Sequence, residues 1–328
     1  MAENTITGRA KKHDGTAIDY VSIFNWNDGT CIAQITPNAA GIWNYQYLTN
    51  LKVGITYIAD GCEPVTHGAY NFIAAWTPLK LQPKLYMDTN SAIWSGSVGS
   101  NITAWQDLSG EQSNFLPMGT VIKASDGVLS MPSGNNYLYN STTKTRFILS
   151  GVGKAWVFMI VKPTVTDTLF FQVTDTSGAT SQVRLGLMYV EGKFLSISSK
   201  DSRSNSNDNF LSNPYPVNEY HMILLEHEWS TGRLAWHING TLDKEVANHL
   251  QPSSIGTTNA AMANNNVFIG QYAGSGTTRS HNQKALIVKT DDNLTQDTID
   301  KLFGYAAHKH GLTAKLPANH PYKNNAPT

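Results

Sequence analysis

Short runs rich in β-branched and aromatic residues, separated by two-residue turn pairs, recur along most of this chain. Asp-Gly stands at 28–29 and Asn-Gly at 239–240. Both pairs accept positive φ angles and favour tight hairpins. Alternation with a period of two accompanies them, so that Leu234, Trp236 and Ile238 share one face of a predicted strand, with Arg233, Ala235 and His237 on the other. The pattern predicts antiparallel sheets built from hairpins.

The predicted strands form two groups joined by a proline-containing linker. Residues 1–75 contain short strands typical of a small antiparallel sandwich, and residues 76–83 have no regular period. Residues 84–328 contain the second, larger group of strands. Within it, residues 154–163 are almost wholly apolar, as expected of a central strand covered on both faces. We therefore predict one small and one large β-sandwich.

Near the end of the chain the period changes to that of an amphipathic helix. Thr295 is suited to cap the N-terminus of this helix, and Gly311 is suited to follow its last residue. The apolar positions expected to face the sandwich are Ile299, Leu302, Phe303, Ala306 and Ala307.

Three histidines lie in or after this helix. His308 and His310 are two residues apart, so their side chains point about 200° apart around the helix axis and cannot bind one metal ion together. His320 lies beyond the helix. The pattern favours a structural helix end over a metal site.

Charge and composition exclude several classes of function. The chain of 328 residues has 24 basic and 24 acidic residues, so it has no net positive charge to attract nucleic acid. No apolar run has the length of a membrane span, and the N-terminus lacks the apolar core of a signal peptide. We expect synthesis in the cytoplasm, without membrane insertion. The two cysteines, Cys31 and Cys62, either face each other across the small sandwich or remain free buried thiols, which a reducing cytoplasm favours.

The first group of strands resembles the Ig-like, carboxypeptidase-regulatory type of module found near the start of phage tail and virion-appendage proteins. The matching residues are Gly8, Lys11, Val21, Ile23, Phe24, Gly41, Trp43 and Tyr45.

Residues 84–324 resemble the concanavalin A-like lectin/glucanase (LamG-type) domains of phage and bacterial proteins. At the start of the domain the matches are Leu85, Asp88, Trp105, Asp107, Ser109 and Gly110; at the end they are Gly304, Tyr305, Ala307, Lys309, Gly311, Leu312, Leu316, Pro317, His320, Pro321 and Tyr322. The segments 125–138, 231–241 and 267–274 resemble strands of these domains, with Asn136 in place of the usual Asp. His310 stands where the family has Trp.

These resemblances imply an all-β fold, in which a small Ig-like sandwich precedes a large concanavalin A-like jelly-roll sandwich with a C-terminal amphipathic helix. They also imply a phage tail or baseplate protein, located in the virion, that binds a host-surface polysaccharide or lipopolysaccharide without catalysis. Its other expected partners are tail or baseplate proteins and further copies of itself, with a trimer favoured by analogy.

A glycan site needs aromatic faces together with amides and carboxylates. We expect the segment 200–216 to form a single loop, and this loop has the required composition. Trp94 lies among glycines and serines. The candidate glycan-binding residues are Trp94, Asp201, Arg203, Asn207, Asp208 and Tyr215. Alternatively, the segment is a polar loop without a ligand and Trp94 anchors a loop.

Two other functions remain open. The chain could be a purely structural virion appendage. It could also be a glycoside hydrolase, because Glu226 and Glu228 share one face of a strand as paired carboxylates would. The third carboxylate of the glucanase pattern is replaced by Thr231, so we do not expect an enzyme.

Calcium is the remaining cofactor to consider, since domains of this superfamily sometimes bind it through oxygen ligands. Residues 174–178 and 289–293 are rich in such ligands but have no defined ligand spacing. We expect solvated turns there and no cofactor.

Overall fold

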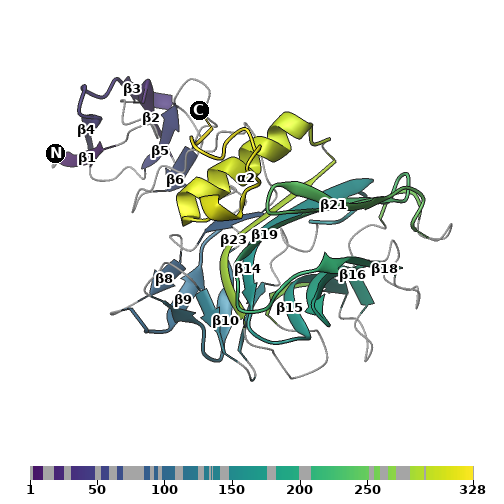
Figure 1. The fold of residues 1–328 in the computed structure, drawn as a ribbon. Coiled ribbons are helices and arrows are strands. Elements are labelled where there is room, and N and C mark those ends of the chain that lie inside the picture. Colours follow the sequence, from purple (N-terminus) through teal and green to yellow (C-terminus); the bar gives the residue numbers. More distant parts are fainter. Residues whose placement is uncertain are drawn as a thin grey trace. The chain divides into compact units, whose positions relative to one another are not determined.

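The computed structural model describes residues 3–9, 18–25, 31–48, 53–58, 65–68, 85–88, 92–94, 98–107, 114–124, 129–132, 134, 136–140, 148–175, 182–198, 208–250, 255–258, 265–270, 281–291 and 293–327. The chain forms two compact units, residues 1–82 with 326–328 and residues 83–325 (Figure 1). Each unit is described by itself.

The N-terminal unit consists of antiparallel strands. Strand β1 (Glu3–Arg9) pairs with β4 (Ile42–Leu48). A second sheet has the order β3 (Cys31–Ile35), β2 (Tyr20–Asn25), β5 (Val53–Ile58) and β6 (Val65–Gly68). Val21 and Ile23 are fully buried, which confirms the alternation predicted for this strand. The predicted turn at 28–29, Cys62 and the side chain of Cys31 lie outside the described residues.

The C-terminal unit contains two large antiparallel sheets. Among the described residues, the seven-stranded sheet has the order β10 (Leu116–Met118), β13 (Tyr137–Asn140), β22 (Asn265–Ile269), β15 (Thr168–Asp175), β16 (Gln182–Val190), β17 (Lys193–Ser198) and β18 (Asp208–Pro214). The eight-stranded sheet has the order β11 (Ile122–Lys123), β12 (Leu129–Met131), β23 (His281–Thr290), β14 (Lys154–Pro163), β19 (His221–Glu228), β20 (Arg233–Ile238) and β21 (Thr241–Val246), with β7 (Leu85–Asp88) also paired to β23. A short hairpin joins β8 (Ala92–Trp94) to β9 (Ile102–Trp105).

The hydrophobic core lies between the inner faces of these two sheets. Val157 and Leu225 from the eight-stranded sheet and Leu187 and Phe171 from the seven-stranded sheet are fully buried in one cluster. Strand β14 lies between β19 and β23, and both its faces are covered, as predicted from its apolar sequence. The predicted all-β fold with one C-terminal helix is confirmed.

Two hairpin turns have left-handed backbone at both of their central residues. Glu191-Gly192 connects β16 to β17, and Asn239-Gly240 connects β20 to β21. All four residues have positive φ angles, between 48° and 84°. This is the conformation that a two-residue hairpin turn requires, and it is costly for most residues other than Gly and Asn.

Helix α2 (Gln296–His310) packs on the outer face of the eight-stranded sheet (Figure 1). The Thr295 side chain accepts a hydrogen bond from the Thr298 backbone N–H, and Gly311 ends the helix in the left-handed conformation, as predicted. Phe303 meets Phe158 of β14 edge-to-face, with 5.4 Å between ring centroids. The helix therefore covers apolar side chains on the outer face of the sheet. No helix in the described part of the chain is long and apolar enough to span a membrane.

The end of the helix is tied to the first strand of the unit by ion pairs. The buried Asp88 lies 3.0 Å from Lys309 Nζ and 3.2 Å from His310 Nε2. His310 thus has a charged partner where the resemblance expects Trp. His308 instead contacts the backbone oxygen of Tyr322 at 2.9 Å. The two histidines have separate structural partners.

The tail after the short 3₁₀ helix η3 (Thr313–Lys315) folds back over the helix. A Cβ added to Gly304 would lie 2.9 Å from Tyr322 Cγ and closer still to its Cβ. A Cβ on Gly240 would lie 2.9 Å from the His320 ring. The glycines at these positions therefore make room for the side chains of the tail.

One prediction is corrected in this unit. The sequence predicts a single loop over residues 200–216, but residues 208–214 form β18. Phe210 and Ser212 are buried while Asn209, Leu211 and Asn213 are exposed, so the segment has the two-residue period of a strand. Its polar composition concealed this period because the polar side chains occupy the solvent face.

Candidate functional site

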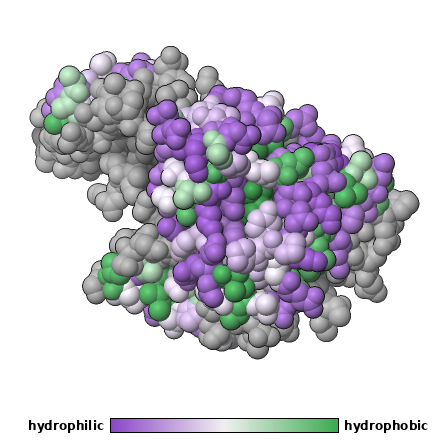
Figure 2. All heavy atoms as spheres, in the orientation of Figure 1, coloured by the Kyte–Doolittle hydropathy of each residue, from purple (hydrophilic) through white to green (hydrophobic). Residues whose placement is uncertain are grey.

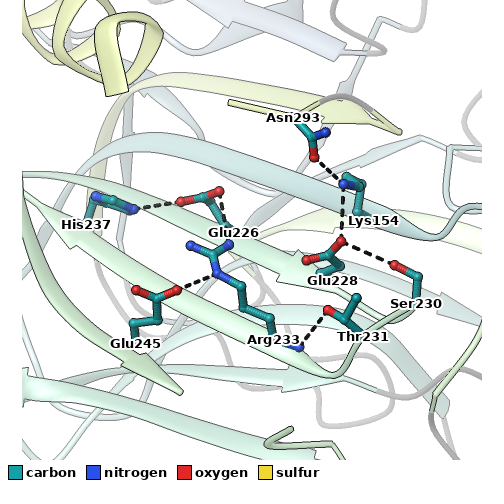
Figure 3. Close-up of polar contacts among 9 residues, drawn as sticks. All are labelled: Lys154, Glu226, Glu228, Ser230, Thr231, Arg233, His237, Glu245 and Asn293. Carbon is teal, nitrogen blue, oxygen red and sulfur yellow. Dashed lines mark hydrogen bonds and ion pairs between the residues drawn. The ribbon is translucent and has the colours of Figure 1, made fainter. Parts of the chain in front are cut away.

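A hollow of about 380 Å³ lies on the outer face of the eight-stranded sheet, beside the start of α2. It is lined mainly by charged and polar side chains of β14, β19, β20 and β21 and by the segment 293–296. Figure 3 shows the polar residues that meet there. We call it the charged hollow. Its named members are Lys154, Trp156, Glu226, Glu228, Arg233, His237, Glu245 and Asn293.

The strand register brings these side chains together. Lys154, Glu228 and Arg233 occupy directly opposed positions on three neighbouring strands. Trp156, Glu226, Ala235 and Glu245 form the next row. Opposed residues in an antiparallel sheet point to the same face, so both rows face outward. The alternate residues Leu225 and Leu234 lie in the core.

Glu226 and Arg233 form the centre of a hydrogen-bonded network. Glu226 accepts a hydrogen bond from His237 Nε2 at 2.7 Å through one oxygen and contacts Arg233 Nη1 at 3.3 Å through the other. The Arg233 Nε–H in turn donates to Glu245. Burial alone would raise the pKa of Glu226, but the hydrogen bond from His237 and the charge of Arg233 outweigh burial and lower it. This carboxylate is therefore ionised and fixed by two partners.

Glu228 and Lys154 form a second pair in the charged hollow. Lys154 Nζ lies 3.2 Å from Glu228 Oε1 and also donates to Asn293 Oδ1. Burial would raise the pKa of Glu228, but hydrogen bonds from Lys154, Thr231 and Ser230 outweigh it and lower the pKa. Glu228 is thus also ionised at neutral pH.

Trp156 is the aromatic residue among those that line the charged hollow. Its residue is only 2% exposed, and its indole nitrogen has no hydrogen-bond acceptor among the described residues. A buried indole N–H without an acceptor is costly, because the group has lost its bond to water. The charged hollow therefore contains fixed carboxylate, guanidinium and ammonium groups beside a buried indole N–H that has no described acceptor.

This arrangement suits recognition better than acid–base catalysis. A glycosidase acid must carry a proton near neutral pH, which requires a raised pKa. The pKa values of Glu226 and Glu228 are both lowered. Their oxygens are engaged by basic and hydroxyl side chains that favour the ionised form. The pair predicted as a possible catalytic dyad shares one face of β19, but neither member is poised to donate a proton.

Most of the predicted glycan-binding residues have side chains that lie outside the described residues. Asp201, Arg203 and Asn207 lie outside the described residues. Asp208 begins β18, and Trp94 ends β8, but the side chains of both also lie outside the described part.

Tyr215 is the one predicted glycan-binding residue whose side chain the structure describes. Its hydroxyl donates a hydrogen bond to Asp243 at 2.8 Å. Its ring packs against Phe194 and His221, with centroid distances of 5.8 and 5.5 Å. Burial and the neighbouring Asp243 carboxylate raise the pKa of Tyr215. The ring is thus half-buried and held on both sides rather than standing free in a loop.

The sequence contained a usable signal for the charged hollow. The alternation in β20 already places Arg233 and His237 on one face, opposite the core residues. The sequence does not show the partners of Arg233, because only the register across β19, β20 and β21 brings Glu226 and Glu245 beside it.

An exposed apolar strip lies on the outer face of the seven-stranded sheet. Leu116 opposes Tyr139, Met118 opposes Tyr137, and Tyr139 opposes Phe268. Leu116 and Met118 are 58% and 47% exposed. We call these five residues the apolar strip. By contrast, the face of the C-terminal unit visible in Figure 2 is mostly hydrophilic, with small, scattered hydrophobic areas.

Neither predicted oxygen-rich turn forms a described metal centre. Among the described residues, no group of three or more His, Cys, Asp or Glu side chains is placed to hold a metal ion. In the segment 289–293, Asp291 accepts a hydrogen bond from the Gly153 backbone N–H, and Asn293 accepts from Lys154. In the segment 174–178, only Thr174 and Asp175 are described, within β15.

Comparison with known proteins gives only structural likeness. No family model matches the sequence, and no curated protein matches it. The receptor-binding domain of botulinum neurotoxin mosaic serotype C/D is similar over 67% of this chain and 50% of its own, with 9% identity and a TM-score of 0.47. The binding domain of botulinum neurotoxin DC in complex with SialylT gives 68% and 51%, with 10% identity and a TM-score of 0.46. The botulinum neurotoxin type G receptor-binding domain gives 67% and 50%, with 11% identity and a TM-score of 0.46. This chain thus matches about half the length of each, and what those proteins bind carries no weight for its own ligand.

Proposed function

We propose that this chain is a non-catalytic carbohydrate-binding protein of a phage tail or baseplate. In this proposal it attaches the virion to a host-surface polysaccharide or lipopolysaccharide through the charged hollow. The sequence phrases that resemble virion modules and lectin-like domains support the setting. The observation that carries the binding function is the charged hollow itself, with its fixed carboxylates and guanidinium.

Sugar hydroxyls are recognised by groups of this kind. Each hydroxyl donates one hydrogen bond and accepts others, so it can bridge a carboxylate and a neighbouring guanidinium or ammonium. In the charged hollow, Glu226, Arg233 and Glu245 already hold one another, so little side-chain freedom is lost on binding. A preorganised polar hollow of this kind suits a small polar ligand.

The first test is binding of the labelled, purified protein to intact host bacteria, with and without their extracted surface polysaccharide. Saturable binding that the polysaccharide removes is the expected result. Arg233→Lys keeps the charge but loses the fork that joins Glu226 to Glu245, so it should weaken binding about tenfold. Glu219→Gln is the matched control, because Glu219 pairs with Lys315 outside the charged hollow.

The possible results test the binding function and the position of the binding site separately. If the wild-type protein does not bind cells at micromolar concentration, the proposed function is wrong. If it binds and Arg233→Lys binds equally well, the charged hollow is not the binding site. Release of reducing ends from the polysaccharide that is lost in Glu228→Gln would show instead that the chain is a hydrolase.

The apolar strip favours a second candidate, a structural part of the virion. Exposed apolar surface of this kind marks contacts between proteins. Strand β10 is the end strand of the seven-stranded sheet among the described strands, and an end strand can pair with its own copy across a symmetry axis. The partner in this candidate is therefore a second copy of the chain, and the mass of the protein in solution tests it.

A further inference from the structure

We propose that the charged hollow prefers sugars that carry a free amino group over neutral and acidic sugars, and that Glu245 recognises the amine. This inference rests on the proposed carbohydrate-binding function and specifies its ligand class.

The first argument is the balance of charge in the lining. Three carboxylates, on Glu226, Glu228 and Glu245, face one lysine, Lys154, and one arginine, Arg233. The lining also contains His227 and His237, and His237 already donates its hydrogen bond to Glu226. Both cations already have carboxylate partners: Lys154 pairs with Glu228, and Arg233 pairs with Glu226 and Glu245. An incoming carboxylate, sulfate or phosphate would have to displace one of these partners. An incoming ammonium meets an excess of negative charge instead.

The second argument is the position of Glu245. Its side chain is 41% exposed, more than those of Glu226 and Glu228, at 15% and 20%. One of its oxygens accepts from Arg233 Nε, and Figure 3 shows its other oxygen without a contact among the residues drawn. Glu226, by contrast, uses both oxygens within the network. Glu245 is therefore the carboxylate in the charged hollow best placed to accept from a ligand.

The third argument is how Glu245 is held. Glu245 lies opposite Ala235, one row from Arg233. Because the alanine side chain is small, it leaves space beside Glu245. The hydrogen bond from Arg233 fixes its carboxylate plane. An ammonium group supplies three N–H donors and, unlike a guanidinium, does not require two acceptors in one plane. A single well-placed carboxylate oxygen therefore suits it. N-acetylation removes the charge and enlarges the group, which should weaken this contact.

The test uses three methyl glycosides that share one ring: glucosamine, N-acetylglucosamine and glucuronic acid. Each is titrated into the full-length protein at about pH 7, where an amine with a pKa near 8 is mostly protonated. The readout is the backbone and indole N–H signals in a nitrogen–proton NMR spectrum, with the Trp156 signal assigned by Trp156→Phe. We expect glucosamine to bind about three- to tenfold more tightly than N-acetylglucosamine, and glucuronic acid to bind most weakly.

Glu245→Gln tests the role of the proposed residue. The variant keeps an oxygen that can accept from Arg233 but loses the charge, so the preference for glucosamine over N-acetylglucosamine should disappear. Glu219→Gln, which changes an exposed glutamate outside the lining, should leave the preference as it is.

Each outcome has one meaning. Equal binding of glucosamine and N-acetylglucosamine to the wild type, or tightest binding of glucuronic acid, overturns the amine preference and leaves the carbohydrate-binding function standing. A preference that persists in Glu245→Gln overturns the assignment to Glu245. Shifts by none of the three sugars, with no cell binding in the first test, overturn the carbohydrate-binding function itself.

Discussion

Replacing Gly304 with alanine should destabilise the C-terminal unit, although alanine is the better helix former. Inside a helix, alanine is favoured over glycine by about 1 kcal/mol. Here the added Cβ would lie 2.9 Å from Tyr322 Cγ and closer still to its Cβ, well inside normal van der Waals contact. Overpacking of this kind costs about 1–3 kcal/mol. Because the clash involves the first atom of both side chains, no rotamer change relieves it. The overpacking cost should therefore be about 2–3 kcal/mol, the upper part of this range, which leaves a net loss of about 1–2 kcal/mol.

The size of this loss depends on how firmly the tail is held against the helix. The backbone oxygen of Tyr322 contacts His308 at 2.9 Å. The neighbouring Lys323 donates hydrogen bonds from Nζ to the backbone oxygens of Thr313 at 2.8 Å and Leu316 at 2.7 Å. To move away from residue 304, the tail would have to break these contacts. The tail therefore resists the small shift that would otherwise absorb the clash.

Equilibrium unfolding in urea measures the effect, and a second substitution tests its cause. Tyr322→Ala would keep the clashing Cβ, so Tyr322→Gly is the informative partner. In the Tyr322→Gly background, Gly304→Ala should become stabilising by about 1 kcal/mol, because only the helix preference remains. If Gly304→Ala stabilises the protein with Tyr322 intact, the close packing of the tail on the helix is refuted.

Three further predictions concern the helix cap, a buried histidine and the apolar strip. Thr295→Ala should lower the free energy of unfolding by about 1 kcal/mol, and Thr295→Ser should not, in the same urea assay. Burial lowers the pKa of His227 to about 3, so the unfolded chain binds a proton below about pH 6.5 that the folded protein does not. The free energy of unfolding should therefore fall between about pH 6.5 and 3, by up to about 1.4 kcal/mol per pH unit from this group, and His227→Asn should remove that part of the slope. If copies associate through the apolar strip, Leu116→Ser with Met118→Ser should lower the mass measured by light scattering, whereas Val165→Ser, at an exposed residue of a turn, should leave it unchanged.

The fold was largely predictable because its signals are local. Turn pairs such as Asn239-Gly240 have the positive φ angles expected of them, and Thr295 and Gly311 mark the two ends of the helix. These residues act on their own neighbours in the chain, so no tertiary contact is needed to interpret them. The same dependence on local pattern explains why the loop predicted over residues 200–216 is wrong: the polar residues lie on the solvent face of β18 and hide its period.

The candidate site was less predictable because it depends on register. The sequence predicts Glu226 and Glu228 as possible catalysts, yet their chemistry is set by partners from β14, from β20 and from the turn between β19 and β20. Those partners lower both pKa values, and the sequence gives no means to see this. Tyr215 was expected in a glycan site, but its ring packs in an aromatic cluster and its hydroxyl is bonded to Asp243.

The sequence alone determined the class of fold, most of the described strands, turns such as Asn239-Gly240, and the position and caps of the one described α-helix, because each is set by residues close together in the chain. Only the tertiary structure decided that Arg233 would bridge Glu226 and Glu245, or that Asp88 would meet Lys309 across most of the C-terminal unit. The energy of an ion pair depends on the distance between its two charges, and here that distance is set only when the strands pair in the folded sheets.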